Sequence, residues 1–257
     1  MKVTVCELSD EPAAFSREWA RLVTHVSRNG SDFLLLPEMP FYPWFAVSPK
    51  FKLDTWNEAV AAHRKWLGRL PEMGSITVAG SCPVNRRGRR LNQGFLWSSK
   101  YGLKWVHTKS YLPNDGEYME AKWYDRGDRR FVPVEMLGCK LGFMICTDLW
   151  AMPHARRYGK QGVQLLVVPR VTEELTTEKW LAGGKVAAVV AGSFCISSNR
   201  TIRTGSGIFG GNGWIIGPDG EELGLTSPER PFVTTDIDLK RANRAKKTYP
   251  RYSLEPD

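Results

Sequence analysis

The pattern of apolar and polar positions along the chain follows two different periods, and each change of period marks an expected element. Residues 2–8 alternate and are rich in β-branched side chains, which predicts a strand. Residues 11–28 place apolar side chains at helical spacing, and Asn29-Gly30 ends the predicted helix. Residues 32–38 form a short apolar run, which is typical of a strand that is buried on both faces.

The same alternation of strands and helices continues along the chain. We expect helices over about 54–70, 153–161 and 176–191, and strands over 76–84, 93–97, 103–107, 138–146, 164–170, 193–199, 213–220 and 232–239. Buried strands that alternate with helices predict the α/β class. Hairpin-like pairs at Pro83–Asn92 and Pro218–Gly220 favour mixed sheets over parallel ones. Because no linker or low-complexity stretch interrupts this series, we expect residues 1–257 to form a single domain.

Length, composition and cysteine usage narrow the class of protein. The chain has 257 residues, of which 42% are hydrophobic and 25% charged, so it is long enough to bury a core without disulfides. Its five cysteines are an odd number and are widely spaced, which favours reduced thiols in a cytoplasmic protein. Glu7 and Asp10 come too early for a signal peptide, and no apolar run is long enough to span a membrane. We therefore expect no membrane partner.

The formal net charge of +9 raises the question of an anionic partner. The basic residues form short, separate clusters at 86–90, 126–130 and 241–251, and the first of these is expected at a hairpin tip. No nucleic-acid-binding motif accompanies them. We interpret the clusters as solvated surface and expect no nucleic-acid partner.

Three of the predicted strands end in a reactive side chain next to a turn. These side chains are Glu38, Lys109 and Cys146. Because α/β sheets bind ligands outside the ends of their strands, we expect the three groups to converge. Together they suit acyl transfer, in which a thiol attacks a carbonyl, a carboxylate takes the thiol proton and an ammonium stabilises the oxyanion. From position alone, Cys146 can equally be a small core residue, Glu38 a cap and Lys109 a surface residue.

The segments around these residues resemble the three boxes of the nitrilase superfamily of carbon–nitrogen hydrolases. LLLPEMPFYPW resembles its Leu-Pro-Glu box, HTKSYLPND its lysine box, and LGFMICTDLWAMPHARRYGKQGVQLLVVPR its nucleophile box. EAKWYDRGD, SSNR and GNGWIIGPDG resemble further segments of the family. The three boxes occur in the family's order and extend over most of the chain, so the joint match is specific although each box alone is not.

The resemblance implies a role for each catalytic candidate. Cys146 becomes the nucleophile, Glu38 the general base and Lys109 the cation that stabilises the oxyanion. Glu120 becomes an auxiliary carboxylate, and its spacing to the following aromatic residue and Gly-Asp turn favours it over the nearby Glu117. The resemblance also implies a four-layer αββα sandwich of two mixed sheets, no cofactor or metal, and a homodimer or larger homo-oligomer.

Candidate substrate-binding residues lie close to the boxes. The backbone N–H of Thr147 would be a second donor to the oxyanion, and Tyr42 and Trp150 are candidate pocket walls or plain packing residues. Arg170 ends the predicted strand 164–170 and is a candidate fork for a substrate carboxylate. The alternative for Arg170 is a surface arginine that pairs with an acidic residue of 173–174.

The function that the resemblance implies is hydrolysis of a non-peptide C–N bond in a small amide or carbamoyl substrate. The reaction would pass through a thioester and release ammonia or an amine and a carboxylic acid. The acidic residue two positions after the cysteine, Asp148, is amidase-like. The alternatives are a nitrilase that acts on a nitrile, and a non-catalytic or regulatory relative that acts as a binding module.

Three rival patterns in the sequence carry less weight. The G-x-G-x-x-G at 205–210 lacks the strand before it and the helix after it that a dinucleotide site needs, so we expect a tight loop. A Cys-His protease needs a histidine beside Cys146, and His107, the best candidate, is expected either to support the site residues from behind or to be a packing residue. No cysteine or histidine spacing is typical of a metal site.

Overall fold

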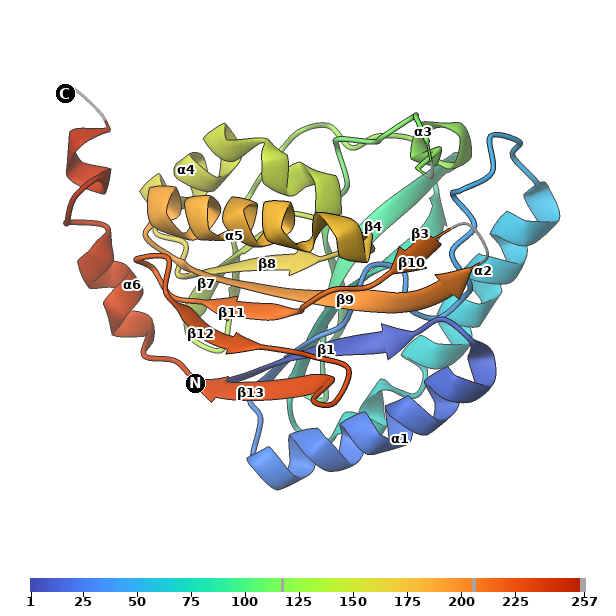
Figure 1. The fold of residues 1–257 in the computed structure, drawn as a ribbon, viewed down its shortest axis with the longest axis horizontal. Helices are drawn as coiled ribbons and strands as arrows, with labels where there is room; N and C mark the ends of the chain where they lie inside the picture. The colour runs from blue at the N-terminus through green and yellow to red at the C-terminus, as the bar shows by residue number, and fades with distance from the viewer. Residues whose placement is uncertain (117, 205–206, 255–257) are drawn as a thin grey trace.

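Two β-sheets pack face to face and helices cover their outer faces in this computed structural model, which describes residues 1–116, 118–204 and 207–254 (Figure 1). The first sheet has the order β5-β4-β3-β2-β1-β13. Its strands are β1 (Lys2–Ser9), β2 (Phe33–Leu35), β3 (Thr77–Arg86), β4 (Arg89–Ser98), β5 (Gly102–Thr108) and β13 (Phe232–Asp236). The second has the order β6-β7-β8-β9-β11-β12. Its strands are β6 (Val134–Met136), β7 (Cys139–Phe143), β8 (Leu165–Pro169), β9 (Phe194–Thr204), β11 (Trp214–Ile216) and β12 (Glu222–Leu225).

Both sheets mix parallel and antiparallel pairs. Strands β1, β2 and β3 are parallel, as are β7, β8 and β9, whereas β4, β5, β6, β11, β12 and β13 pair antiparallel to their neighbours. The short β10 (Gly207–Phe209) pairs antiparallel with the end of β9. The sheets join where the end of β1 runs parallel to β9, with Glu7 opposite Asn199. The predicted mixed α/β architecture is confirmed.

Helices α1 (Pro12–Asn29) and α2 (Leu53–Leu67) cover the first sheet, and α4 (Met152–Lys160) and α5 (Thr177–Ala191) cover the second (Figure 1). Short helices α3 (Glu120–Trp123) and α6 (Leu239–Ala245) and four single 3₁₀ turns complete the described elements. Helix α1 begins where the Glu11 carboxylate accepts hydrogen bonds from two backbone N–H groups, and it ends at Gly30, whose φ of 60° is left-handed. The Asn-Gly stop in the sequence therefore predicts the end of this helix correctly.

Alternate side chains of the central strands pack into separate layers of the core. Phe33 and Leu35 pack between the sheets, whereas Leu34 faces α1. In β8, Leu165 lies between the sheets and Leu166 faces α4 and α5. Both strands are therefore buried on both faces, which explains why their sequences are apolar throughout. Among the described residues, no helix is both long enough and apolar enough to cross a bilayer.

The elements that the sequence analysis missed are short and carry little apolar pattern. They are α3, β6, β10, β12 and α6. The predicted strand 32–38 is also longer than the observed β2, because Pro37 has no N–H to donate to a neighbouring strand. These differences lie mainly at the sheet edges and in the loops, while the strands that carry the reactive residues are in the predicted places.

Candidate active site

Glu38, Lys109 and Cys146 lie just beyond the C-terminal ends of β2, β5 and β7. Strand β5 runs parallel to β3 because both pair antiparallel with β4, and β3 is parallel to β2. Parallel pairing then continues through β1, β9 and β8 to β7. All three strands therefore point the same way, and the three side chains are delivered to one edge of the sandwich.

Lys109 forms the centre of a fully buried charged cluster. Its Nζ lies 2.8 Å from Glu38 Oε1, and 2.7 and 2.6 Å from the two carboxylate oxygens of Glu120. All three side chains have 0% exposure. A buried charge is tolerated when it is paired and hydrogen-bonded, and here one ammonium serves two carboxylates.

Neutral side chains also donate to the carboxylate oxygens that face Lys109. Asn92 Nδ2 donates to Glu38 Oε1 at 2.7 Å, and the Tyr124 hydroxyl donates to Glu120 Oε2 at 2.5 Å. The other oxygen of Glu38, Oε2, is buried and has no hydrogen-bond partner within the described residues. Oε2 is therefore the one carboxylate oxygen of the cluster that is free to accept a proton.

Burial and charge act against each other in the titration of this cluster. Burial alone lowers the pKa of Lys109, but the charges of Glu120 and Glu38 outweigh it, so the pKa rises well above its ordinary value. Lys109 is therefore a permanent cation at neutral pH. Burial raises the pKa of Glu120 to about 7, against the opposing charge of Lys109.

Cys146 occupies a strained turn at the start of a 3₁₀ helix over Cys146–Trp150. Its φ is 48°, a left-handed conformation that costs a non-glycine residue on the order of 1–3 kcal/mol and persists where the surroundings enforce it. Burial raises the pKa of its thiol, the Glu38 carboxylate raises it further, and Lys109 opposes both. A nearby ammonium lowers the pKa of a thiol. That effect is present but outweighed, so the resting thiol is protonated and needs a base to react.

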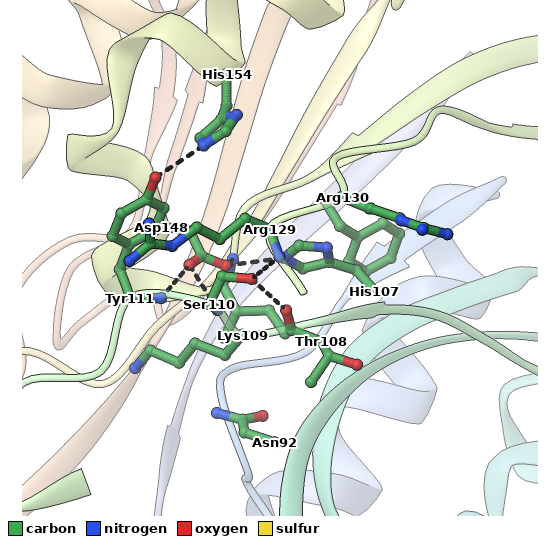
Figure 2. A network of polar contacts seen from close by, with 12 residues as sticks. Asn92, His107, Thr108, Lys109, Ser110, Tyr111, Arg129, Arg130, Asp148 and His154 are labelled. Atoms are coloured by element: carbon green, nitrogen blue, oxygen red, sulfur yellow. Dashed lines mark hydrogen bonds and ion pairs between the residues drawn. The ribbon is translucent and has the colours of Figure 1, made fainter. Parts of the chain in front are cut away.

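The lysine segment and the cysteine turn are tied together by Asp148 (Figure 2). Its carboxylate accepts hydrogen bonds from the backbone N–H groups of Ser110, Tyr111 and Ile145. His107, for which the sequence left open a supporting or a packing role, also bonds Asp148, with Nε2 2.9 Å from Oδ2.

The predicted pocket walls lie in different surroundings. The Tyr42 hydroxyl donates to Glu58 at 2.7 Å, and burial together with Glu58 raises the pKa of Tyr42 to about 12. The Trp150 ring packs against Trp180 with 5.0 Å between centroids and remains 45% exposed. Thr147 is half-buried directly after Cys146. These contacts do not assign a substrate role to any of the three candidates.

Tyr118 is an aromatic residue near the cluster that the sequence analysis did not select. Burial is the main cause that raises its pKa, and the carboxylates of Glu173, Glu120 and Glu38 raise it further. Its ring meets Phe209 edge to face at 5.8 Å. Tyr118 lies only a few residues after the lysine box. The Asn-Asp-Gly stretch between them is polar and typical of an exposed turn, so the sequence does not indicate that Tyr118 lies near the charged cluster.

Arg170 is buried and does not lie at the surface. It has 0% exposure, so a surface arginine pairing with an acidic neighbour is wrong. Its three guanidinium nitrogens donate to Ser197 Oγ at 2.8 Å, Thr172 Oγ1 at 2.6 Å and the Asn212 carbonyl. Its guanidinium also lies 4.1 Å from the ring centroid of Trp214. These contacts place Arg170 in the core. Its role as a fork for a substrate carboxylate stays a prediction.

Two sequence interpretations fall wholly or partly outside the described residues. Glu117, the alternative to Glu120, lies outside them, as do the first two residues of the G-x-G-x-x-G stretch at 205–210. All five cysteines are described, and each is a buried free thiol. Within the part of the chain that the structure describes, no group of three or more His, Cys, Asp or Glu side chains is arranged to hold a metal ion.

The chain is similar to known proteins both in sequence and in fold. Residues 2–247 match the model of the carbon-nitrogen hydrolase family. The omega-amidase NIT2 of Xenopus tropicalis is 24% identical over 228 residues, which cover 86% of this chain and 81% of that protein. The crystal structure of a carbon-nitrogen hydrolase from Helicobacter pylori G27 superposes with a TM-score of 0.88 at 19% identity, covering 99% of this chain and 95% of that one.

A further solved structure carries a covalent adduct. It is a variant of the amidase from Nesterenkonia sp. AN1 with the acetamide moiety of fluoroacetamide added to its active-site cysteine. It superposes with a TM-score of 0.77 at 19% identity, and the match covers 99% of this chain and 95% of that one.

Proposed function

Because the chain belongs to the carbon–nitrogen hydrolase family, we propose that its buried Glu38–Lys109–Cys146 set hydrolyses a small amide through a covalent thioester. The protein is a carbon–nitrogen hydrolase, and its reaction is amide hydrolysis by a thiol. The observation that carries the residue assignment is the free Oε2 of Glu38 beside a lysine held by two carboxylates.

In the first half-reaction, the Cys146 sulfur attacks the amide carbon while its proton passes to Glu38 Oε2. Because burial keeps the thiol protonated at rest, this general-base step is required. Lys109 Nζ stabilises the negative charge that develops on the carbonyl oxygen, and the Thr147 N–H is a second donor. The C–N bond then breaks as protonated Glu38 returns the proton to the leaving nitrogen.

In the second half-reaction, water attacks the thioester carbon and Glu38 again takes the proton. The C–S bond breaks, the thiol recovers a proton and a carboxylic acid leaves. Glu120 keeps Lys109 in position through two charge-assisted hydrogen bonds, and Tyr124 holds Glu120 in turn.

We propose a small primary amide as the substrate class, with a terminal amide of a dicarboxylic acid as the first candidate. The support for the terminal amide is the name of the relatives, omega-amidase. We further propose a single catalytic domain that works in the cytoplasm as a homodimer or larger homo-oligomer. Five free, buried thiols fit a reducing compartment, and α5 exposes Val186 on its outer face.

The proposal is tested with purified protein and an assay for released ammonia. The substrates are succinic acid monoamide, propionamide, N-carbamoylglycine and propionitrile. Cys146→Ala should abolish turnover and leave the melting temperature unchanged within a few degrees, because the thiol is the only covalent centre of the mechanism. Cys139→Ala is the matched control, since Cys139 is also buried at 3% exposure but lies at the start of β7.

Four outcomes would contradict parts of this proposal. Turnover by Cys146→Ala within tenfold of the wild type would contradict the nucleophile assignment. Ammonia from the nitrile alone would indicate a nitrilase, and no turnover of any of the four compounds would favour a binding module. Sedimentation at micromolar concentration that shows only a monomer would contradict the oligomer.

A further inference from the structure

One buried carboxylate connects the two segments that carry the proposed nucleophile and oxyanion cation (Figure 2). Asp148 Oδ1 lies 3.0 Å from the backbone nitrogens of both Ser110 and Tyr111. Its Oδ2 lies 3.1 Å from the backbone nitrogen of Ile145 and 2.9 Å from His107 Nε2. The Asp148 side chain has 0% exposure. Because an ionised carboxylate only accepts, all four nitrogens donate to it.

The donors are placed on both sides of the reaction centre. Ser110 and Tyr111 directly follow Lys109, and His107 lies two residues before it, on the same strand end. Ile145 directly precedes Cys146. A single side chain therefore fixes the backbone on both sides of the gap between the ammonium and the thiol. Hydrogen bonds to a charged acceptor are about twice as strong as neutral ones, and they are also geometrically restrictive.

The cysteine turn needs such a restraint. The left-handed φ of Cys146 is unfavourable for a residue with a Cβ and is kept only where the surroundings over-determine it. The Asp148 carboxylate accepts a hydrogen bond from the backbone N–H of Ile145, the residue just before Cys146. Asp148 itself lies two residues after Cys146, so this bond joins the two sides of the strained turn. The same carboxylate then anchors this turn to the lysine segment.

Aromatic packing fixes the orientation of the His107 ring that donates to Asp148. Its ring packs against Phe131 with 4.8 Å between centroids, and Phe131 stacks on His154 at 3.7 Å. His154 in turn bonds the Tyr111 hydroxyl, so the packing returns to the lysine segment (Figure 2). The donor nitrogen of His107 is thereby aimed at Asp148 and does not compete for the cysteine.

We infer that Asp148 is a positioning residue that sets the separation between the Cys146 thiol and the Lys109 ammonium, and that His107 fixes the orientation of its carboxylate. This inference rests on the proposed roles of Cys146 and Lys109. Because a misplaced nucleophile or oxyanion donor affects the transition state more than substrate binding, the role predicts a loss of kcat with little change in KM.

Asp148→Asn is the first variant. Its amide oxygen can still accept from Ser110 and Tyr111, but its NH₂ group faces two donors, the Ile145 N–H and His107 Nε2. We expect kcat to fall about 100-fold and KM to stay within threefold, measured on whichever of the four test substrates the wild type turns over fastest. The labelling rate of Cys146 with iodoacetamide, followed by mass spectrometry, should fall at least tenfold. Asp128→Asn is the matched control, because Asp128 is an exposed aspartate that accepts from the Arg130 N–H.

A second pair of variants tests His107 by rescue. His107→Gln keeps an N–H donor near the position of Nε2 and should retain kcat within fivefold, whereas His107→Leu removes it and should lose at least tenfold. In the Asp148→Asn background, His107→Leu should add less than threefold, because the contact is already broken. A purely structural role would lower the melting temperature of these variants without this rescue and without the separation of kcat from KM.

The outcomes separate this inference from the proposed function. If the wild type shows no Cys146-dependent turnover, the proposed function fails first. If wild type and Cys146→Ala behave as proposed while Asp148→Asn and His107→Leu both stay within threefold of the wild-type kcat, the positioning role alone is wrong. If Asp148→Asn does not fold, the His107 pair decides, and equal activity of His107→Gln and His107→Leu overturns the inference.

Discussion

Lys109 and Arg170 are two buried cations in similar places, and their partners differ in kind. Each follows the C-terminal end of a strand, Lys109 after β5 and Arg170 after β8, and each has 0% exposure. Lys109 is bonded to two carboxylates. The guanidinium of Arg170 is bonded to hydroxyl and carbonyl oxygens and lies over an indole ring. Position and burial are thus alike, while the charge of the partners is not.

The difference in partners determines how each cation titrates. Burial lowers the pKa of both, but two carboxylates reverse the effect for Lys109, whereas the pKa of Arg170 falls to about 9. Both side chains remain protonated at neutral pH. Lys109, however, belongs to a cluster in which one carboxylate oxygen, Glu38 Oε2, has no hydrogen-bond partner among the described residues. This oxygen can accept a proton. The hydrogen-bond acceptors of Arg170 are all neutral.

The largest expected effect comes from removing the cation of the charged cluster. Lys109→Ala should lower kcat at least a hundredfold, because one preorganised oxyanion donor contributes about 2.7–4 kcal/mol to transition-state stabilisation. Lys109→Arg should restore little of it, since a planar guanidinium places its N–H groups differently from a compact ammonium. Steady-state kinetics with the ammonia assay measures both variants. A wild-type rate for Lys109→Arg would show that the lysine is peripheral and would remove the contrast with Arg170.

The sequence predicted the position of Lys109 better than that of Arg170 for a physical reason. The apolar strand and the turn that deliver Lys109 are local features, so they are readable within a few residues. Of the three hydrogen-bond partners of Arg170, Thr172 is local, but Ser197 lies on β9 and Asn212 in the loop before β11. Contacts between residues so far apart in sequence leave no periodic signal. A strand end alone therefore does not predict these partners.

The same reasoning applies to the other members of the charged cluster. Asn92 lies inside β4 between Leu91 and Gln93, and no local pattern marks it as a partner of Glu38. Tyr124 stands four residues after Glu120, a spacing that brings side chains together in a helix and was available in the sequence. The sequence pattern therefore indicates the reactive groups at the strand ends and the local Glu120–Tyr124 pair, whereas a partner such as Asn92 is brought to Glu38 only by the tertiary fold.

A smaller effect, and one of a different type, is expected at Arg170. Arg170→Ala should lower the free energy of unfolding by about 2–4 kcal/mol, because it leaves a cavity and removes the donors to buried oxygens. It should change kcat/KM for succinic acid monoamide and for propionamide by the same factor. Urea unfolding and the two kinetic assays measure this. A rise in KM of tenfold or more for the acidic amide alone would support the carboxylate fork and reverse the comparison.

The smallest effect concerns His63, which extends the comparison to a buried base with only backbone partners. His63 on α2 is 1% exposed, its Nδ1 lies 2.7 Å from the Ala59 carbonyl, and its Nε2 accepts from the Phe41 N–H at 3.3 Å. Burial lowers its pKa to about 3, and the nearby Arg200 charge acts in the same direction. Arg170 begins from a much higher pKa and stays charged, whereas His63 becomes neutral.

The sign of the resulting pH effect follows from proton binding. Between pH 3 and pH 6.5, the unfolded chain binds a proton at residue 63 and the folded chain does not, so the stabilising contribution is complete above pH 6.5 and is lost as the pH falls. From pH 7 to pH 5 the free energy of unfolding falls by about 2 kcal/mol from this group. The fall occurs mainly below pH 6.5, at about 1.4 kcal/mol per pH unit. Urea unfolding at the two pH values should therefore show about 2 kcal/mol less pH dependence for His63→Gln than for the wild type. His25→Gln, at a half-buried histidine whose pKa burial also lowers, is the matched control and should remove less. An unchanged pH dependence in His63→Gln would mean that the buried ring keeps its proton, and that neutral backbone partners can support a buried charge without a carboxylate.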